Sequence, residues 1–403
     1  MRQLGVNSLW LALARAGAQG FSLALSLLLA RRLGEAGFGE YAWLAAMTTI
    51  GNAVTTFGTD TVIIRELARD DRATPALLGA AIWLQLGLSA LWLLAVWTVG
   101  GPGLLLWFSL ALLPLSPYTA FSAALRAHDA LQQFAWLNLM AAALVLALAA
   151  WLVQSRADLP ALAAATFGAQ TFAGVMALWL CRRVVPRFAV SVAWDGTVLA
   201  AVLRAAFPLA LLMALAMVYQ RLGVLALARL TDDTATGLYS AAARIVEGLK
   251  LGHYALLGAL LPLASRTPRS TAARRAPWLL LVLSLALAGG VTQWAGWLIE
   301  LLFGAPYAAA AAGLRVLVWL LVPYSVSAYL SVQFVARNTE YRLLLATLLT
   351  LVVSVALHGW LIPPWGLIGA GWAMVLSECV LAASLFAFSR SEARRREAPE
   401  PTS

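Results

Sequence analysis

Long apolar runs follow one another along the chain, and this pattern constrains the fold more than any other feature. Of the 403 residues, 62% are hydrophobic and only 11% are charged, which leaves too little polar surface to cover a water-soluble globule. A chain in hydrocarbon must pair every backbone group internally, so it forms helices or a closed barrel. The runs are about twenty residues long and lack the alternation of barrel strands. The sequence therefore predicts an all-α polytopic membrane protein.

Twelve helices are predicted from the apolar windows, six on each side of a polar segment. They are expected at 8–30, 41–64, 76–99, 103–124, 134–153, 160–180, 198–226, 237–262, 277–302, 313–336, 342–362 and 367–389. We therefore expect an N-terminal six-helix bundle at 1–181, a cytoplasmic linker at 182–197, a C-terminal six-helix bundle at 198–389 and a disordered basic tail at 390–403.

The basic residues give this scheme an orientation. With the N-terminus inside, the segments predicted to be cytoplasmic hold 18 of the 28 Lys and Arg residues, the outer loops hold four, and six lie within predicted helices. Cytoplasmic loops of membrane proteins carry such an excess. The sequence thus predicts a multi-pass protein of the bacterial inner membrane with both termini cytoplasmic. The net charge of +10 is accounted for by these loops, so we expect no nucleic-acid partner.

A short motif recurs and supports two related halves. Ala30-Arg31 and Gly39-x-Tyr41 reappear as Ala228-Arg229 and Gly237-x-Tyr239, all shifted by 198 residues. This shift is close to the spacing of the first predicted helices of the two halves, which end at residues 30 and 226. Duplicated halves are typical of transporters that open alternately to the two sides.

Charged residues within the predicted helices outline polar stripes. A charge at the bilayer centre costs about 2.5 to 3.5 kcal/mol even on a lenient scale, so such residues face a polar interior. Arg15 lies on a narrow stripe of the first helix, and Asp60 on a polar arc of the second, where it is expected to pair with an arginine. The strongest stripe combines Arg244, Glu247 and Lys250 in the eighth helix.

The seventh helix carries Arg204 and Arg221, seventeen residues apart, or about 25 Å along a straight helix. Snorkelling to the headgroups is the alternative for these two arginines. More cations than carboxylates lie in the predicted helices, which favours an anionic ligand, and a phosphate or pyrophosphate suits the arginine fork. No glycine-lysine phosphate loop is present. No cofactor or metal is therefore expected, and an ion gradient, the membrane potential or consumption of the product would drive transport.

Several stretches resemble the polysaccharide and O-antigen flippases of the multidrug/oligosaccharidyl-lipid/polysaccharide exporter superfamily. These stretches are LARRLGEAGFGEYAWLAAM, TFGTDTVIIREL and FPLALLMALAMVYQRLGVLALARLTDDTATGLYSAAARIVEGL. The resemblance covers essentially the whole chain. It implies two pseudo-symmetric six-helix bundles forming a V around a cationic cavity that opens alternately inward and outward.

The resemblance also implies a cargo, namely an undecaprenyl-pyrophosphate-linked oligosaccharide. This would be an O-antigen repeat unit, as in lipopolysaccharide biosynthesis, or an exopolysaccharide repeat unit. Arg15, Arg244 and Lys250 would hold the pyrophosphate, and Arg204, Arg221 and Arg65 would assist. Asp60, Arg65 and Glu247 are the expected gate or charge-pair residues. The family often has Asp shortly after the arginine matching Arg221, whereas Leu222 and Gly223 stand here. Partners would be the lipid-linked glycan, the bilayer, a polysaccharide polymerase and a chain-length regulator.

Other functions remain open at this point. A lipid II flippase usually has two more helices, and a multidrug antiporter is expected to favour buried carboxylates over arginines. The second loop, RELARDDRAT, lacks the signature of a major-facilitator carrier. A polytopic polysaccharide polymerase or glycosyltransferase is the enzyme alternative, but such enzymes usually need a large hydrophilic loop and paired carboxylates. A transporter rather than an enzyme is therefore expected.

Overall fold

A computed structural model shows an all-helical chain. It describes residues 2–69, 74–154, 158–185, 188–191, 193, 195–266, 271–336 and 339–397, and contains no strand within them. Most of the helices exceed the length needed to cross a bilayer. Their bounds are α1 (Arg2–Thr56), α2 (Thr59–Leu67), α3 (Thr74–Gly100), α4 (Leu104–Ser109), α5 (Leu112–Ala127), α6 (Leu131–Gln154), α7 (Leu159–Val184), α8 (Gly196–Leu230), α9 (Asp233–Arg266), α10 (Thr271–Phe303), η2 (Ala305–Ala309), α11 (Ala310–Leu317), η3 (Val318–Leu320), α12 (Leu321–Ala336) and α13 (Glu340–Glu397).

Eight described helices are long and apolar enough to cross a membrane. Two of the longest helices are each divided by a glycine in a non-helical conformation, Gly34 in α1 and Gly366 in α13. With these divisions, each of the twelve ranges predicted from the sequence corresponds to a helical segment in the described part of the chain. The chain is thus a polytopic helical membrane protein, as predicted.

Several local boundaries differ from the prediction. Residues 31–40, expected to form an outer loop, are helical on both sides of the kink at Gly34, so Arg31 and Arg32 lie on a helix. The predicted helix at 41–64 is interrupted at Phe57 and Gly58, whose φ angles are 50° and 64°. Residues 390–397, assigned to a disordered tail, continue α13, and 398–403 lie outside the described residues.

The chain forms two compact units. Unit 1 comprises Met1–Arg32 and Leu44–Met217, and unit 2 comprises Leu33–Trp43 and Val218–Ser403. The sequence analysis placed the division at the 182–197 linker, whereas the compact units divide within α8. A short stretch of α1 also belongs to unit 2.

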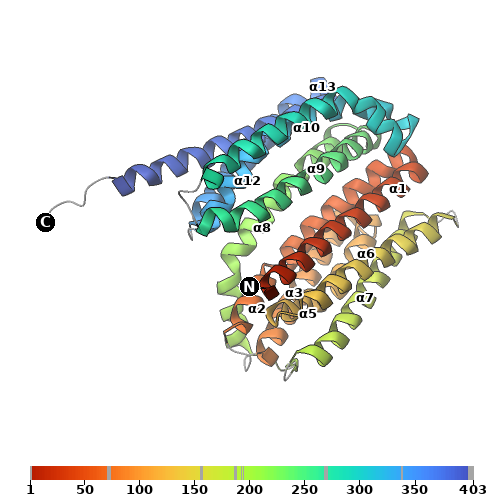
Figure 1. The fold of residues 1–403 in the computed structure, drawn as a ribbon. Coiled ribbons are helices and arrows are strands. Elements are labelled where there is room, and N and C mark those ends of the chain that lie inside the picture. The colour runs from red at the N-terminus through yellow and green to blue at the C-terminus, as the bar shows by residue number, and fades with distance from the viewer. Residues whose placement is uncertain are drawn as a thin grey trace. The chain divides into compact units, whose positions relative to one another are not determined.

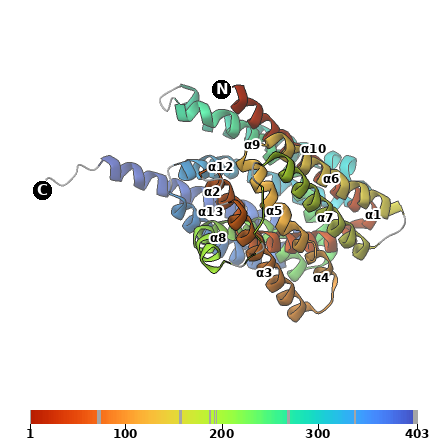
Figure 2. The same ribbon diagram turned by 90° about the horizontal axis from the view of Figure 1, so that it is seen from below.

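Unit 1 is built on close helix packing through small residues. α5 packs along α7, and α7 along α6, and these helices run side by side (Figures 1 and 2). Gly174 of α7 faces the carbonyl oxygen of Pro114, which an added Cβ would approach to 3.3 Å. Small side chains at such contacts let helix backbones approach closely in membranes. The core also contains the buried residues Ile63, Leu78, Ala120, Ala124, Ala177 and Cys181.

Unit 2 contains α9 to α13 together with the end of α8. α12 packs against α13, and α11 packs against both α9 and α13. In Figure 1, α9 and α10 run next to each other, and they are also in contact. Large hydrophobic side chains are exposed on both units, which is expected for surfaces solvated by lipid. They include Trp97, Val99, Trp151, Trp278, Trp294 and Trp360.

Candidate functional site

The charged stripe of α9 meets an arginine of α8 in unit 2. Arg221 of α8 and Arg244 of α9 each donate to a different oxygen of Glu247, both at 2.9 Å. Arg244 and Glu247 are three residues apart on α9, which places their side chains on one face of the helix. The carboxylate therefore lies between two guanidinium groups, one from its own helix and one from α8.

The arginines of this cluster keep donor capacity. The side chains of Arg221 and Arg244 are 23% and 20% exposed, and that of Glu247 is 36% exposed. The Nε atom of Arg221 is buried and has no hydrogen-bond partner among the described residues. A guanidinium has five N–H donors, and a buried donor without a partner costs free energy. The cluster thus retains places for an additional acceptor such as a phosphate oxygen.

Lys250 lies next to this cluster on α9, one turn beyond Glu247. Its Nζ atom is 4.6 Å from the centre of the Tyr324 ring on α12, a cation–π distance. Glu247 and Glu378 both interact with it electrostatically. Lys250 is therefore a half-buried cation that lies over an aromatic ring beside the arginine cluster.

Glu378 of α13 is the most enclosed carboxylate of this region, being only 3% exposed. Tyr219 of α8 donates to its Oε2 atom at 2.7 Å, and Ser327 of α12 donates to its Oε1 atom. Both carboxylate oxygens are thus satisfied by hydroxyl groups, which is what allows a carboxylate to be buried. The network joins three helices of unit 2.

The repeated Gly-x-Tyr motif positions the first turns of α9. A Cβ atom on Gly39 would lie 1.8 Å from the carbonyl oxygen of Asp233, and one on Gly237 would lie 2.0 Å from that of Glu35. The two glycines shifted by 198 residues therefore face each other where α1 crosses α9 within unit 2. Two residues after Gly237, the hydroxyl of Tyr239 fills the space beside Gly223 on α8.

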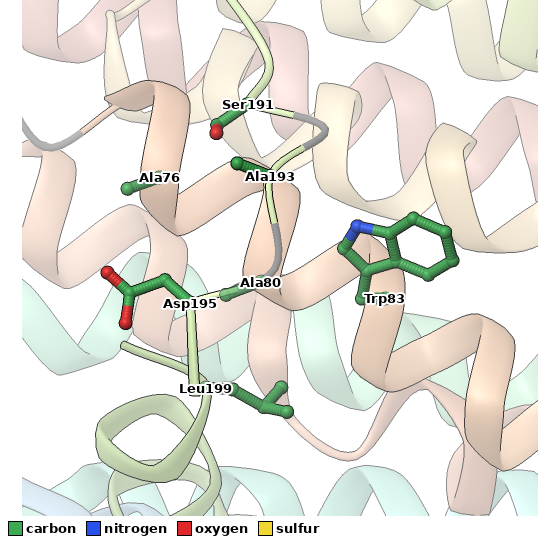
Figure 3. Close-up of a pocket in the computed structure, with 7 residues that line it drawn as sticks. All are labelled: Ala76, Ala80, Trp83, Ser191, Ala193, Asp195 and Leu199. Atoms are coloured by element: carbon green, nitrogen blue, oxygen red, sulfur yellow. The ribbon is translucent and has the colours of Figure 1, made fainter. Parts of the chain in front are cut away.

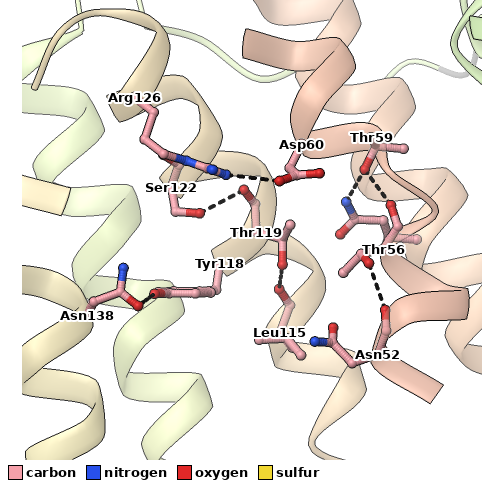
Figure 4. A network of polar contacts seen from close by, with 11 residues as sticks. Asn52, Thr56, Thr59, Asp60, Leu115, Tyr118, Thr119, Ser122, Arg126 and Asn138 are labelled. Carbon is pink, nitrogen blue, oxygen red and sulfur yellow. Dashed lines mark hydrogen bonds and ion pairs between the residues drawn. The ribbon is translucent and has the colours of Figure 1, made fainter. Parts of the chain in front are cut away.

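A separate ion pair lies in unit 1. Arg126, in the last turn of α5, donates to Asp60 of α2 at 3.3 Å, and the two side chains are 24% and 23% exposed. Figure 4 shows the two side chains pointing toward each other, and the Arg126 guanidinium also lies 5.1 Å from the Phe134 ring. Asp60 was expected to pair with an arginine, and it does so, but with an arginine that the sequence analysis placed in a loop.

The other predicted site residues belong to unit 1. Arg204 is exposed on α8 in unit 1, and Arg65 pairs at 3.0 Å with its neighbour Glu66 at the end of α2. Arg15 lies in α1, but its side chain is outside the described residues. The structure thus brings together Arg221, Arg244, Glu247 and Lys250, and it places Asp60 in a different ion pair.

Sequence reasoning missed two residues of these networks, Arg126 and Glu378. Arg126 was counted as a cytoplasmic loop residue because α5 was ended at residue 124, one turn too early. Glu378 has no role in the prediction from the sequence because a position at the membrane interface accounts for it equally well. Its signal would have been the small, polar neighbour Ser377 in an otherwise apolar helix.

A small pocket of about 120 Å³ lies where the linker packs on α3 in unit 1 (Figure 3). The amide of Ser191 donates to the carbonyl oxygen of Pro75 at 2.9 Å. None of the predicted site residues lines this pocket, whose walls are Ala76, Ala80, Trp83, Ser191, Ala193, Asp195 and Leu199.

The site chemistry is that of anion binding. Among the described residues there is no group of three or more His, Cys, Asp or Glu side chains that could hold a metal ion. The cluster offers guanidinium and ammonium donors on neighbouring turns, and these groups bind phosphate oxygens. The fold and this cluster together define a polytopic helical membrane protein that presents anion-binding groups in unit 2.

Comparisons with known proteins place the chain in a family. The model for polysaccharide biosynthesis proteins matches residues 4–268, which is well over half of the chain. The chain therefore belongs to the polysaccharide biosynthesis protein family. A comparison with curated protein sequences found no match.

Solved structures with the same fold are transporters of the MOP superfamily. An inward-facing multidrug resistance MATE transporter has a TM-score of 0.74 and 17% identity, with 94% of this chain and 96% of that chain covered. The lipid II flippase MurJ has a TM-score of 0.70 and 13% identity, covering 94% and 86%. A MOP transporter from Pyrococcus furiosus, described as having a binding pocket of reverse polarity, has a TM-score of 0.63 and 16% identity, covering 98% and 97%. At these identities the likeness concerns the fold.

Proposed function

We propose that this protein is a flippase that moves an undecaprenyl-pyrophosphate-linked oligosaccharide, such as an O-antigen or exopolysaccharide repeat unit, across the bacterial inner membrane by alternating access. The observation that carries the proposal is the cluster of Arg221, Arg244 and Lys250 in the interior of a polysaccharide biosynthesis family member. The pyrophosphate is the charged part of such a cargo, and it needs cationic donors within the membrane.

Glu247 has a defined role in this proposal. Its carboxylate accepts from both arginines, and it thereby occupies the positions that phosphate oxygens would take. An arriving pyrophosphate carries more negative charge and more acceptor oxygens than one carboxylate, so it competes for both guanidinium groups. Release of the cargo lets Glu247 pair again. The carboxylate thus keeps two interior arginines satisfied when no cargo is bound.

The remaining parts of the proposal concern direction and energy. The excess of basic residues in predicted cytoplasmic segments supports cytoplasmic termini and transport from the cytoplasmic to the periplasmic leaflet. An ion gradient, the membrane potential or consumption of the product by a polysaccharide polymerase would drive net transport, with no cofactor. A chain-length regulator would act with that polymerase after translocation.

The experiment measures flipping of a fluorescent undecaprenyl-pyrophosphate-linked glycan in vesicles containing the purified protein. Arg244→Ala and Arg221→Ala are expected to lower the rate by at least about tenfold, because each removes a charge-assisted interaction with phosphate. Arg315→Ala is the matched control, since Arg315 is exposed on α11 and should leave the rate unchanged. Arg15→Ala tests the residue whose side chain is not described.

Two results would contradict the proposal. Full flipping by folded, inserted Arg221→Ala and Arg244→Ala variants would show that the cluster does not hold the cargo. Polymerised glycan formed by the purified protein would instead favour an enzyme. Parallel assays with lipid II and with a cationic drug distinguish the other two transport activities, because only lipid II shares the pyrophosphate.

A further inference from the structure

The break between α1 and α2 in unit 1 has more hydrogen-bond acceptors than donors. Phe57 and Gly58 adopt positive φ angles there and end the α1 helix at Thr56. The last turn of a helix leaves carbonyl groups without intrahelical partners and carries a partial negative charge. Figure 4 shows this break, with the side chains of Asn52, Thr56, Thr59 and Asp60 around it.

The threonine hydroxyls at the break already donate their hydrogens to backbone carbonyl groups. Thr55 and Thr56 both donate to the carbonyl oxygen of Asn52, at 3.3 and 2.7 Å, and Thr59 donates to that of Thr56 at 2.7 Å. Thr55 is 2% exposed and Thr59 is fully buried. None of these three hydroxyls is therefore left to donate to a further acceptor.

Gln85 of α3 leaves a buried acceptor at this place. Because the single hydroxyl hydrogen of Thr59 points to Thr56, the Thr59 oxygen must accept, and Gln85 donates to it through Nε2. This fixes the amide orientation and leaves Oε1 of the fully buried Gln85 without a partner. The Oδ1 atom of Asn52 is also buried and without a partner. Two amide oxygens thus lie at the break with no donor among the described residues.

We infer that this break is a binding site for a small monovalent cation of the sodium type, held by the amide oxygens of Asn52 and Gln85 with threonine and backbone oxygens of α1. Oxygen ligands suit hard cations, and unwound backbone at the C-terminal end of a half-helix is a known way to coordinate them within membranes. Binding and release of the cation at this break would couple an ion gradient to a change in the angle between α1 and α2.

The charges around the break favour a monovalent over a divalent ion. Asp60 is the nearest carboxylate, and it already pairs with Arg126, so the local formal charge is close to zero. Calcium sites use several carboxylates, and the described residues offer no such group. Neutral oxygens with the partial charge of a helix end match a single positive charge better than two.

The test measures ²²Na⁺ binding to the purified protein in detergent, with unlabelled NaCl or choline chloride as competitor. We expect saturable binding that NaCl displaces and choline does not. Gln85→Leu should weaken the affinity by at least about tenfold, and Gln85→Glu should strengthen it by a similar factor because a carboxylate is a better cation ligand. Asn138→Leu is the control, since that amide already accepts from Tyr118 at 3.1 Å.

The outcomes separate the possible occupants. Binding that follows this order in the two Gln85 variants supports the cation site. If the wild type binds no ²²Na⁺ above background, the break holds water instead and the inference is overturned. Equal affinities in the wild type, Gln85→Leu and Gln85→Glu would overturn it as well. The measurement uses no lipid-linked glycan, so its failure would leave the proposed flippase activity untouched.

Discussion

Glu247 accepts hydrogen bonds from two arginines that the proposed cargo also needs, so its carboxylate competes with the cargo for them. Glu247→Gln keeps the size of the side chain but removes its charge, so Arg221 and Arg244 become freer to bind an anion. We expect the affinity for inorganic pyrophosphate to rise by about tenfold, the equivalent of one hydrogen bond to a charged group. Isothermal titration of the purified protein measures this.

We expect release of the cargo to be slower in the same variant. An uncharged side chain at position 247 competes less well with the cargo for the two guanidinium groups. Flipping by Glu247→Gln is therefore expected to be slower than in the wild type, although the variant binds pyrophosphate more tightly. Unchanged or weaker pyrophosphate binding would mean that Glu247 only supports the fold. Glu300→Gln, an exposed carboxylate of α10, provides the control for the loss of one negative charge.

Tyr219 satisfies a carboxylate that cannot reach water. Tyr219→Phe removes its hydrogen bond and leaves Oε2 of Glu378 without this donor. A buried acceptor that loses its partner costs about 1 to 3 kcal/mol, so the free energy of unfolding should fall by that amount in denaturant melts. Tyr329→Phe on α12, for which no hydrogen bond to a described residue is observed, should change it little. Equal stability of the two variants would argue that Tyr219 and Glu378 do not depend on each other.

At the residue scale, the sequence was informative where interacting residues share one helix. Arg244 and Glu247 could be paired from their three-residue spacing alone. The partner of Arg221 could not, because it lies 26 residues away on the next helix. The absence of an Asp after Arg221 pointed to a missing charge pair, but Glu247 of α9 supplies the carboxylate, and Gly223 is needed to admit the Tyr239 hydroxyl.

The crossing of α1 and α9 shows at the element scale why a glycine repeats. Gly39→Ala or Gly237→Ala would place a Cβ within 2.0 Å of a backbone carbonyl oxygen of the other helix. The helices must then separate, and overpacking of this kind costs about 1 to 3 kcal/mol. We expect a lower melting temperature in detergent for either variant. Gly20→Ala in α1, where no atom lies within 4 Å of the added Cβ, should not lower it.

If Gly39→Ala melts at the same temperature as Gly20→Ala, the close approach does not exist in the folded protein. At the nearby kink of α1, the carbonyl oxygen of Gly34 accepts a hydrogen bond from Tyr307 of η2 at 2.9 Å. The sequence showed the repeat but not its purpose, since the two copies meet only in three dimensions.

The first turn of α8 depends on Asp195, which lies outside the membrane-spanning segments. Its Oδ1 atom accepts from the Thr197 hydroxyl at 2.6 Å and from the Thr197 and Val198 amides at 2.9 and 3.3 Å. These hydrogen bonds, that of the Thr197 hydroxyl first, lower the pKa of the carboxyl. The ionised form therefore stabilises the fold above the unfolded pKa of about 3.9, and this contribution is lost as the pH falls below it.

Asp195→Asn should accordingly melt at a lower temperature than the wild type at pH 7, and the difference should shrink as the pH is lowered through 4 and below, as measured by melts across that range. Asp158→Asn is the matched control, because Asp158 precedes α7 in the same position but its side chain makes no capping hydrogen bond. A difference for Asp195→Asn that is independent of pH would contradict this cap.

At the scale of the whole molecule, composition and periodicity were sufficient for the fold class and for the twelve helical segments, because each segment is defined by its own apolar length. They were not sufficient for the compact units. Stretches of α1 and α8 belong to unit 2 although most of each helix lies in unit 1, and an apolar window predicts a helix without predicting which helices it packs against. The candidate site was predictable only in part, because residues on different helices, such as Arg221 and Glu247, are brought together only by the packing of those helices.

The basic residues predict an orientation of the molecule in the membrane, and this prediction can be tested on the full chain. With 18 of the 28 Lys and Arg residues in predicted cytoplasmic segments and four in outer loops, the free energy of insertion favours cytoplasmic termini. A fluorescent protein fused to the C-terminus should therefore be fluorescent in cells. Alkaline phosphatase inserted at Gly101, in the turn between α3 and α4, should be active, whereas insertion at Asp129, between α5 and α6, should not be. Activity at Asp129 with none at Gly101 would reverse the orientation, and the proposed direction of transport would reverse with it.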